Sequence, residues 1–345
     1  MKKLIILLLI VLLLILKGIV YSERIMELPE LLNPTSVTMD DNRIYFADRT
    51  SVVVYSLDKS RFIYKFGKEG DGPGEFKIVP NMPMTVHLRN ANLVISNFGK
   101  VSIYTKAGIF KNEIRNKSIA VNLIPCNNLY VGRGFSQSEG QLYFTINIYN
   151  EELNKIKEIY REKSSFQRGT NQKFDPIDAT GPGIAVASNH LFLNIGDNRN
   201  TIAAFDLKGK KLFAFTHNFR EIKLTKAHIK RYMEYLETDP NFRDFVARTK
   251  HLFKFKELFP LVQNLIIDEG KIFVTSYEND HGTRDLYVFT LNGEFIKQME
   301  VPLVSQNVDA PYPFTIHKGK IYQIFENEDD DGWELFSYDI DMSNP

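Results

Sequence analysis

Charged and amide side chains recur in short polar stretches, each placed a few residues after an apolar run. The residues concerned are Asp48, Arg49, Asn97, Asp197, Arg199, Glu278, Asp280 and Arg284. Carboxylates, amides and guanidinium groups at convergent loop tips can orient a ligand through hydrogen bonds. The alternative interpretation is that they are solvated loop tips, where charge is expected in any protein. The choice depends on whether the fold brings the stretches to one face.

A second polar stretch matches the start of a calcium-binding loop. Asn327, Asp329 and Asp331 stand at alternate positions, and Gly332 follows where such a loop turns sharply. The twelfth position of the loop is Tyr338, however, where a bidentate glutamate would be needed. We therefore expect an acidic hairpin tip here and no cofactor, with a calcium ion as the alternative.

A repeat along the chain must position these residues. Six apolar runs, each preceded by turn-forming Asn, Asp or Gly, begin at residues 44, 93, 142, 191, 272 and 321. Neighbouring runs are 49 residues apart, except for one interval of 81. Asn and Gly tolerate the positive φ of tight hairpins, so each run is predicted to be the second strand of a hairpin. The candidate ligand-binding residues then fall in the loops after the second strands.

Each repeat has room for four strands. A first strand lies just upstream of each run, for example at residues 36–39 and 85–88, and in the third repeat the candidate is 129–135. A third strand ends on an aromatic residue such as Tyr55 or Tyr104, and a fourth follows another turn. Four antiparallel strands per repeat are typical of a β-propeller blade. We predict an all-β fold with six such blades.

The two ends of the repeat region are complementary. The last repeat lacks a fourth strand, because only Asp339 to Pro345 follow Tyr338, whereas residues 24–28 precede the first blade without a partner. Pairing the N-terminal strand with the last blade would close the ring and remove an exposed sheet edge. We therefore predict a six-bladed β-propeller over residues 23–345, closed by an N-terminal strand.

The long interval contains an insertion at about residues 221–260, between blades four and five. Thr225 is a suitable N-cap for a helix over residues 227–236, and Asp239-Pro240 is predicted to open a second helix toward Thr249. Phe residues give the insertion an apolar face, and Lys and Arg residues give it a basic one. It could pack flat on the propeller to bury its rings, or serve as a lid or partner-docking arm. Basic amphipathic helices can also adsorb to anionic membranes.

Residues 1–22 have the features of an export signal. Lys2 and Lys3 precede an unbroken apolar run from Leu4 to Leu16, and Val20-Tyr21-Ser22 is compatible with cleavage. The run is shorter than the ~20 residues that a spanning helix prefers. We predict a cleaved signal peptide, with a retained N-terminal anchor as the alternative. The protein would then be secreted or periplasmic, with membrane contact only through this segment.

Residues 66–76, Phe-Gly-Lys-Glu-Gly-Asp-Gly-Pro-Gly-Glu-Phe, resemble the glycine-rich joint between blades of NHL-repeat proteins. Pro80 and Pro83 lie near the position of the proline that opens the next blade, and Gly181-Pro182-Gly183 is a fragment of the same joint. The chain thus resembles exported bacterial six-bladed propellers of the NHL-repeat and TolB-like type. The resemblance implies protein binding or scaffolding, although a minority of these proteins are enzymes such as calcium-dependent lactonases.

Composition and the absence of certain motifs argue against some classes of function. The formal net charge of +1 argues against a nucleic-acid-binding protein, which would show a strong basic excess. No Gly-x-Ser-x-Gly nucleophile motif occurs, and the single cysteine, Cys126, can form no disulfide within the chain. The sequence leaves enzymatic activity open but favours a monomeric binding or scaffold protein at the cell envelope, with a protein or glycan partner.

The alternative function is a metal-dependent hydrolase or lyase with its site in the central channel. Such a site needs carboxylates or imidazoles that converge from several blades. The candidates are Asp48, Asp197, Asp280 and Asp329, which the repeat places on one face.

Overall fold

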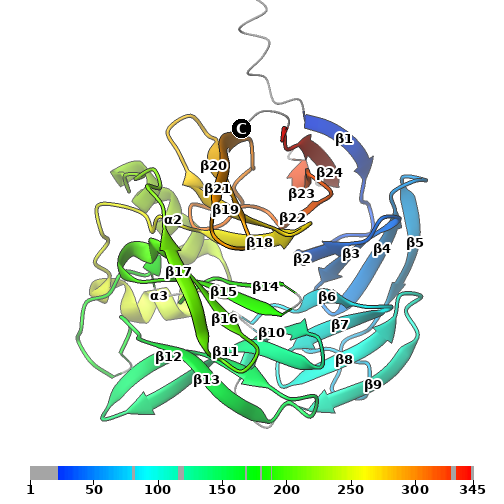
Figure 1. The fold of residues 1–345 in the computed structure, drawn as a ribbon, viewed down its shortest axis with the longest axis horizontal. Helices are drawn as coiled ribbons and strands as arrows, with labels where there is room; N and C mark the ends of the chain where they lie inside the picture. The colour runs from blue at the N-terminus through cyan, green and yellow to red at the C-terminus, as the bar shows by residue number, and fades with distance from the viewer. Residues whose placement is uncertain are drawn as a thin grey trace, which may run out of the picture.

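The structure is a computed structural model, and it describes residues 22–79, 82–115, 120–167, 169–178, 181–187, 189–327 and 332–342. Its strands form six antiparallel sheets of four strands each, arranged as blades around one axis (Figure 1). The predicted six-bladed β-propeller is therefore confirmed. Of the predicted leader, only Ser22, the first residue of β1 (Ser22–Glu27), lies within the described residues. No helix in these ranges is long and apolar enough to cross a bilayer.

Blades 1 to 3 follow β1 in the chain, and within each blade the strands pair in sequence order. Blade 1 comprises β2 (Pro34–Met39), β3 (Arg43–Asp48), β4 (Ser51–Ser56) and β5 (Arg61–Phe66). Blade 2 comprises β6 (Thr85–Arg89), β7 (Asn92–Asn97), β8 (Lys100–Thr105) and β9 (Phe110–Arg115). Blade 3 comprises β10 (Ala120–Cys126), β11 (Leu129–Ser138), β12 (Gln141–Tyr149) and β13 (Lys155–Lys163).

Blades 4 to 6 complete the ring, and the first strand of each blade lies nearest the axis (Figure 1). Blade 4 comprises β14 (Ile184–Ala187), β15 (His190–Ile195), β16 (Thr201–Asp206) and β17 (Lys211–Thr216). Blade 5 comprises β18 (Asn264–Asp268), β19 (Lys271–Glu278), β20 (Arg284–Thr290) and β21 (Phe295–Val301). Blade 6 comprises β22 (Phe314–His317), β23 (Lys320–Asn327), β24 (Gly332–Asp339) and the N-terminal strand β1.

The N-terminal strand closes the ring as predicted. β1 pairs antiparallel with β24 and places Met26 opposite Leu335, and the Leu28 N–H donates to the Trp333 carbonyl at 2.7 Å. The pairing covers the edge of β24, whose N–H and C=O groups would otherwise be free to pair with another chain. If the closing blade is counted as the first because it contains β1, the helical segment lies between blades five and six, and not between four and five as predicted. The blade numbers used in the rest of the text start instead with the blade of β2.

Blade 3 differs from the strand assignment made from the repeat. The run at Leu142 was expected to be its second strand, but it lies in β12, the third strand, and β11 is the second. The connector between blades 2 and 3 spans only residues 116–119, whereas residues 164–183 connect blades 3 and 4. The short and the long connector offset each other, so the 49-residue spacing to Leu142 arises by coincidence.

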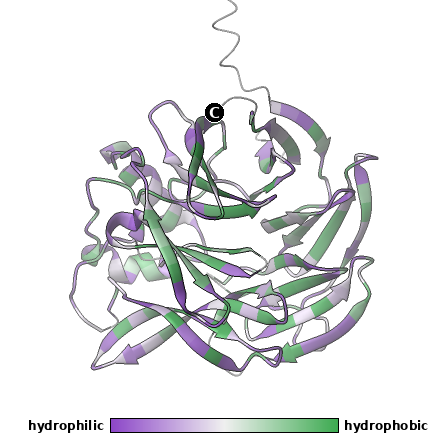
Figure 2. Cartoon of the chain, viewed as in Figure 1, coloured by the Kyte–Doolittle hydropathy of each residue, from purple (hydrophilic) through white to green (hydrophobic). Residues whose placement is uncertain are grey.

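The pattern of burial explains why these segments form strands. The middle strands are buried on both faces, as in β4, where every residue of Ser-Val-Val-Val-Tyr-Ser is buried. Neighbouring blades cover both sides of such a strand, so an unbroken apolar run is stable there. The outer strands face solvent on one side, so most of their residues are exposed or half-buried, and Figure 2 shows these strands as purple and green bands.

The glycine-rich residues 66–76 form the joint between blades 1 and 2. Gly67 adopts a φ of +88°, and a Cβ at this position would lie 2.8 Å from the ring of Phe76. Phe76 is fully buried, and its N–H donates to the Lys68 carbonyl at 2.8 Å. Only glycine combines this backbone conformation with so close a ring. The segment is a connector between strands, as its sequence predicts.

The insertion forms two short helices between β17 and β18. α2 (Lys226–Thr238) begins at a reciprocal cap, because the Thr225 hydroxyl accepts from the His228 N–H and His228 Nδ1 accepts from the Thr225 N–H. α3 (Arg243–Thr249), followed by η3 (Lys250–Leu252), starts three residues later than predicted. The Asp239 carboxylate accepts from the Asn241 N–H at 2.7 Å and thus forms a turn where the sequence predicted a helix start.

The apolar side of the insertion packs on the propeller. Tyr232 and Leu236 of α2 and Val246 of α3 join a buried cluster with Tyr277 of blade 5 and Val308 of the next connector. Burying each such side chain stabilises the fold by about 2 kcal/mol. Of the alternatives that the sequence left open, packing of the insertion on the propeller is what the structure shows. The basic residues remain outside; Lys230, for example, is 77% exposed.

Candidate binding site

The turns between second and third strands lie at the same end of the blades as the connectors from one blade to the next. This arrangement follows from antiparallel pairing, which puts alternate turns at alternate ends of a sheet. α2 and α3 belong to one of the connectors, so they lie on this face, which we call the connector face. The other turns form the opposite face. The sequence-predicted ligand-binding residues all fall on the connector face, but most of their side chains are used within the protein.

Asp48 and Asn97 hold connectors in place. The N–H groups of Leu32 and Asn33 donate to Asp48 Oδ1 at 3.1 and 2.5 Å, and the carboxylate is fully buried. The Asn97 side chain accepts from the N–H and donates to the carbonyl of Lys77, both at 3.0 Å. Arg49 is exposed, with a φ of 52° in the turn after β3.

The predicted residues of blade 5 also comprise side chains that bind within the protein and one that is exposed. Arg284 is fully buried and donates to the Ser276 carbonyl at 3.2 Å and to the Ser305 hydroxyl at 2.6 Å. Burial lowers the pKa of Arg284 to about 10. The Ser305 hydroxyl also donates to the carboxylate of Glu278. Asp280 is exposed at the turn.

Arg199 and Asp197 belong to a tight turn between β15 and β16. They lie in η2 (Asp197–Arg199), where Asn198 and Arg199 adopt positive φ values of 56° and 58°. Two successive non-glycine residues in this region are uncommon and strained, and such strain is often found at functional sites. The Leu261 N–H donates to the Asn198 carbonyl at 2.9 Å, which ties the turn to the segment after the helices.

The turn aims the Arg199 guanidinium at blade 3. Its Nη1 and Nη2 donate to the two carboxylate oxygens of Glu162 at 2.6 and 2.7 Å, and Tyr160 donates to the same carboxylate at 3.1 Å. Burial works against the charge of Arg199, but the hydrogen bonds and charge of Glu162 raise its pKa overall. Burial, and then the charge of Glu162, raises the pKa of Tyr160 to about 12.

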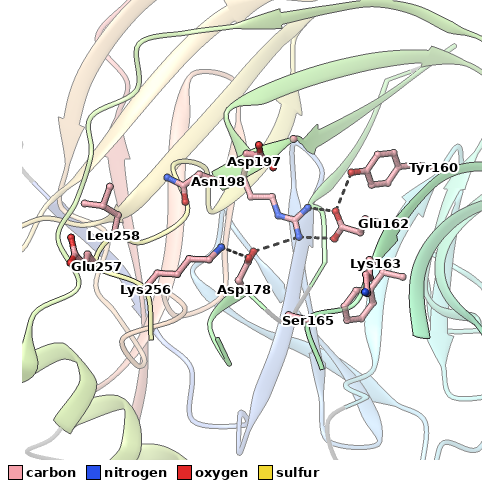
Figure 3. A pocket seen from close by; sticks show the side chains of 13 residues that line it. Tyr160, Glu162, Lys163, Ser165, Asp178, Asp197, Asn198, Lys256, Glu257 and Leu258 are labelled. Carbon is pink, nitrogen blue, oxygen red and sulfur yellow. Dashed lines mark hydrogen bonds and ion pairs between the residues drawn. The ribbon is translucent and has the colours of Figure 1, made fainter. Parts of the chain in front are cut away.

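Asp178 extends this network toward the helical insertion. One of its oxygens lies 3.7 Å from Arg199 Nη2, and the other accepts from Lys256 Nζ at 2.6 Å. The Lys256 N–H donates to the buried carboxylate of Asp175 at 2.9 Å, so the backbone that carries the lysine is fixed. Figure 3 shows the resulting chain of interactions from Tyr160 to Lys256.

These residues line a cavity of about 670 Å³ on the connector face, which we call the Arg199 pocket. Five segments build it: β12, the end of β13, the connector after β13, the η2 turn and residues 256–258. Phe144 adds apolar surface to walls that are otherwise mostly charged or polar. Tyr160 and Leu258, which are labelled in Figure 3, do the same. Paired charges held in fixed positions can recognise a polar ligand without first reorganising.

Sequence reasoning identified Arg199 and Asp197 but missed most of the pocket. Tyr160, Glu162 and Lys163 lie on a strand whose alternating charges are typical of a solvated outer strand. The run at Leu142 had been assigned to the wrong strand, which hid their position at the pocket. The long connector of residues 164–183 is the signal that could have located Asp178, because the other connectors, apart from the one that carries the helices, are shorter.

Of the four carboxylates proposed for a metal-dependent enzyme, the three that the structure describes lie in different parts of the connector face. Asp48 is buried in blade 1, Asp197 lies at the Arg199 pocket and Asp280 is exposed on blade 5. Within the described ranges, no three His, Cys, Asp or Glu side chains are placed to hold a metal. Of the calcium candidates, Asn327 ends β23, whereas Asp329 and Asp331 lie outside the described residues.

No protein-family model and no curated protein matches the sequence. Among solved structures, a luciferin-regenerating enzyme is 11% identical with a TM-score of 0.43, over 92% of this chain and 95% of that one. BamB from Moraxella catarrhalis is 8% identical with a TM-score of 0.33, over 88% and 73% of the two chains. KlHsv2 is 9% identical with a TM-score of 0.39, over 88% and 96%. The fold assignment rests on the sheet topology, independently of these similarities.

Proposed function

We propose that this chain is a binding protein that takes a polar ligand group of its partner into the Arg199 pocket. The observation that carries the proposal is the convergence of five chain segments around a fixed ion-pair network in one cavity of about 670 Å³. Ligand cavities in proteins have volumes of roughly 300–1,000 Å³. The Asn198–Arg199 backbone, with two successive positive φ values, supports the same assignment, because such conformations are often found at functional sites.

The hydrogen-bond partners of the two acids in the pocket support a binding role. Glu162 accepts from Arg199 and Tyr160, and Asp178 accepts from Lys256. These donors hold each carboxylate in one position, where it can act as a fixed hydrogen-bond acceptor for a ligand.

The cellular setting belongs to the same proposal. Residues 1–22 would be a signal peptide or an N-terminal anchor, and residues 23–345 the working propeller outside the cytoplasm. The apolar run after Lys2 and Lys3 and the glycine-rich residues 66–76 support an exported propeller of the NHL-repeat and TolB-like type. The partner would be a protein or a glycan at the cell envelope, bound by a monomeric propeller. The exposed helices α2 and α3 flank the pocket's connector and would contact the same partner.

Binding can be tested with variants that change the pocket but not the fold. Lys163 and Asp197 line it and are exposed, and their side chains form no hydrogen bond or ion pair within the described residues. We expect Lys163→Ala with Asp197→Ala to weaken binding to peptide or glycan arrays about tenfold or more, with an unchanged melting temperature. The control replaces exposed Lys208 and Glu294 by alanine, in turns on the opposite face. Equal binding by both double variants would refute the proposal.

A further inference from the structure

A second, smaller cavity lies behind the Arg199 pocket. It has a volume of about 60 Å³, and Asp178 and Arg199 line both cavities. We call the smaller one the inner chamber. The Arg199–Asp178 contact where the two cavities meet is 3.7 Å long, which exceeds hydrogen-bonding distance. A ligand group that competes for Arg199 would therefore displace only a weak contact.

The inner chamber is lined by two guanidinium groups. Arg133 of β11 reaches it from blade 3, and Arg199 reaches it from the turn of blade 4. Burial, and then the positive charge of Arg199, lowers the pKa of Arg133 to about 10, so both groups are charged at neutral pH. Among the described residues that line the inner chamber, Asp178 supplies one negative charge against the two positive charges of Arg133 and Arg199. The lining of the chamber itself therefore favours an anionic group.

Tyr277 provides an unused hydrogen-bond donor in the same chamber. It is 5% exposed and lines the inner chamber, and its ring stacks on Phe259 with centroids 4.6 Å apart. Among the described residues no atom accepts from, or donates to, its hydroxyl. A buried hydroxyl without a partner loses free energy relative to water unless a ligand or a bound water satisfies it. The hydroxyl is therefore available to a ligand.

The size of the chamber limits what can enter. A cavity of roughly 150 Å³ is needed to hold a benzene ring, so about 60 Å³ is too small for a sugar ring. A carboxylate on a slim aliphatic stem fits, with the rest of the ligand in the larger Arg199 pocket. Glutamate and aspartate side chains have this shape, whereas the carboxylate of a sugar acid is attached directly to its ring.

We propose that the inner chamber binds the carboxylate of an acidic side chain on a partner protein, between Arg133 and Arg199 and within reach of the Tyr277 hydroxyl. This inference deepens the proposed function and rests on it. Arginine is well suited to the role because its planar fork matches a carboxylate. Asp178 does not oppose the ligand strongly, since Lys256 holds it at 2.6 Å.

The probe is the blocked tripeptide acetyl-Gly-Glu-Gly-amide, titrated into the full-length protein and followed by ligand-observed NMR. The peptide with Gln in place of Glu has nearly the same shape without the charge, and we expect it to bind at least tenfold more weakly. Tyr277→Phe should weaken binding of the Glu peptide about tenfold, the usual effect of losing a hydrogen bond to a charged group. Its melting temperature should stay the same or rise, because the hydroxyl has no partner in the free protein.

Tyr338→Phe is the matched control, since Tyr338 of β24 is 3% exposed and lines neither cavity. Equal binding of the Glu and Gln peptides, no binding of either, or an unaffected Tyr277→Phe variant would overturn the carboxylate site. Tighter binding of glucuronate than of the Glu peptide would overturn the assignment to a protein side chain. The Lys163 and Asp197 variants separate this failure from failure of the proposed function, because they test the outer pocket alone.

Discussion

Arg199 donates to both carboxylate oxygens of Glu162, at 2.6 and 2.7 Å, and so joins the η2 turn of blade 4 to the outer strand of blade 3. The pair is largely shielded from water, with side chains 8% and 19% exposed. Arg199→Met would leave Glu162 without its main partner and should lower the free energy of unfolding by about 3 kcal/mol. Arg199→Lys should cost about half as much, because an ammonium cannot make the paired contacts.

Arg161 supplies the control for this prediction, because it lies on the same strand and pairs with Glu158 in the open. Its side chain is 44% exposed, so Arg161→Met should change the unfolding free energy by less than about 0.5 kcal/mol. Urea denaturation of the three variants measures the differences. Similar losses for Arg199→Met and Arg161→Met would show that the Arg199–Glu162 pair contributes no more than a surface contact.

Asp48 and Arg49 are adjacent in sequence but should respond differently to mutation. Asp48→Ala removes the acceptor of two backbone N–H groups in the connector after β1, so we expect a loss of about 2 kcal/mol in stability. Arg49→Ala removes an exposed side chain and should leave the melting temperature unchanged. Thermal unfolding followed by circular dichroism distinguishes the two. An Asp48→Ala variant as stable as the parent would argue against its role in holding the connector.

The fold could be predicted because its strands depend on local patterns that repeat. Apolar runs preceded by Asn or Gly define hairpins wherever they occur, and the lone strand at residues 24–28 had one open sheet edge to join. Blade 3 was the exception. Its connectors differ in length from those of the other blades, and spacing alone cannot distinguish a shifted strand from a regular one. The sequence also did not indicate that β11 and β12 are longer than the corresponding strands of blades 1 and 2.

The site was harder to predict because its residues come from different kinds of segment. Arg199 stands in a turn, where polar residues attract attention, but Glu162 stands on an outer strand among other charges. Only the fold shows that the end of that strand meets the turn of the next blade. Conversely, Asp48, Asn97 and Arg284 have the residue types of a ligand site, yet their side chains bind neighbouring parts of the protein.

Ring closure should contribute strongly to stability. Met26 of β1 is 7% exposed and packs in a cluster with Phe46 of blade 1 and Leu335 of β24. Met26→Ala should lower the free energy of unfolding by about 3 kcal/mol through lost contacts and a cavity. Glu23→Ala, at an exposed position on the same strand, should have no effect. Chemical denaturation measures both, and equal stability of the two variants would contradict a packed closing strand.

Asp309 should make stability fall as the pH rises. It lies in the connector before β22, and burial, followed by the charge of Asp175, raises its pKa from the ordinary 3.8 to about 7, although Arg284 opposes the shift. Below about pH 4 the folded and unfolded chains both hold the proton, so Asp309 has no effect on stability there. Between pH 4 and 7 only the folded chain holds it, so stability is lost over this window and stays lower above it.

Asp309→Asn removes this dependence. We expect the variant to match the parent near pH 4 and to be about 2 kcal/mol more stable at pH 8, a value reduced from the full shift because the side chain is partly exposed. Asp58→Asn is the control, since hydrogen bonding from Ser56 lowers the pKa of Asp58 and its replacement should give no gain at pH 8. Denaturant titrations at both pH values measure the difference. If Asp309→Asn stabilised the protein equally at pH 4 and pH 8, the effect would come from packing, and the carboxyl of Asp309 would titrate as it does in the unfolded chain.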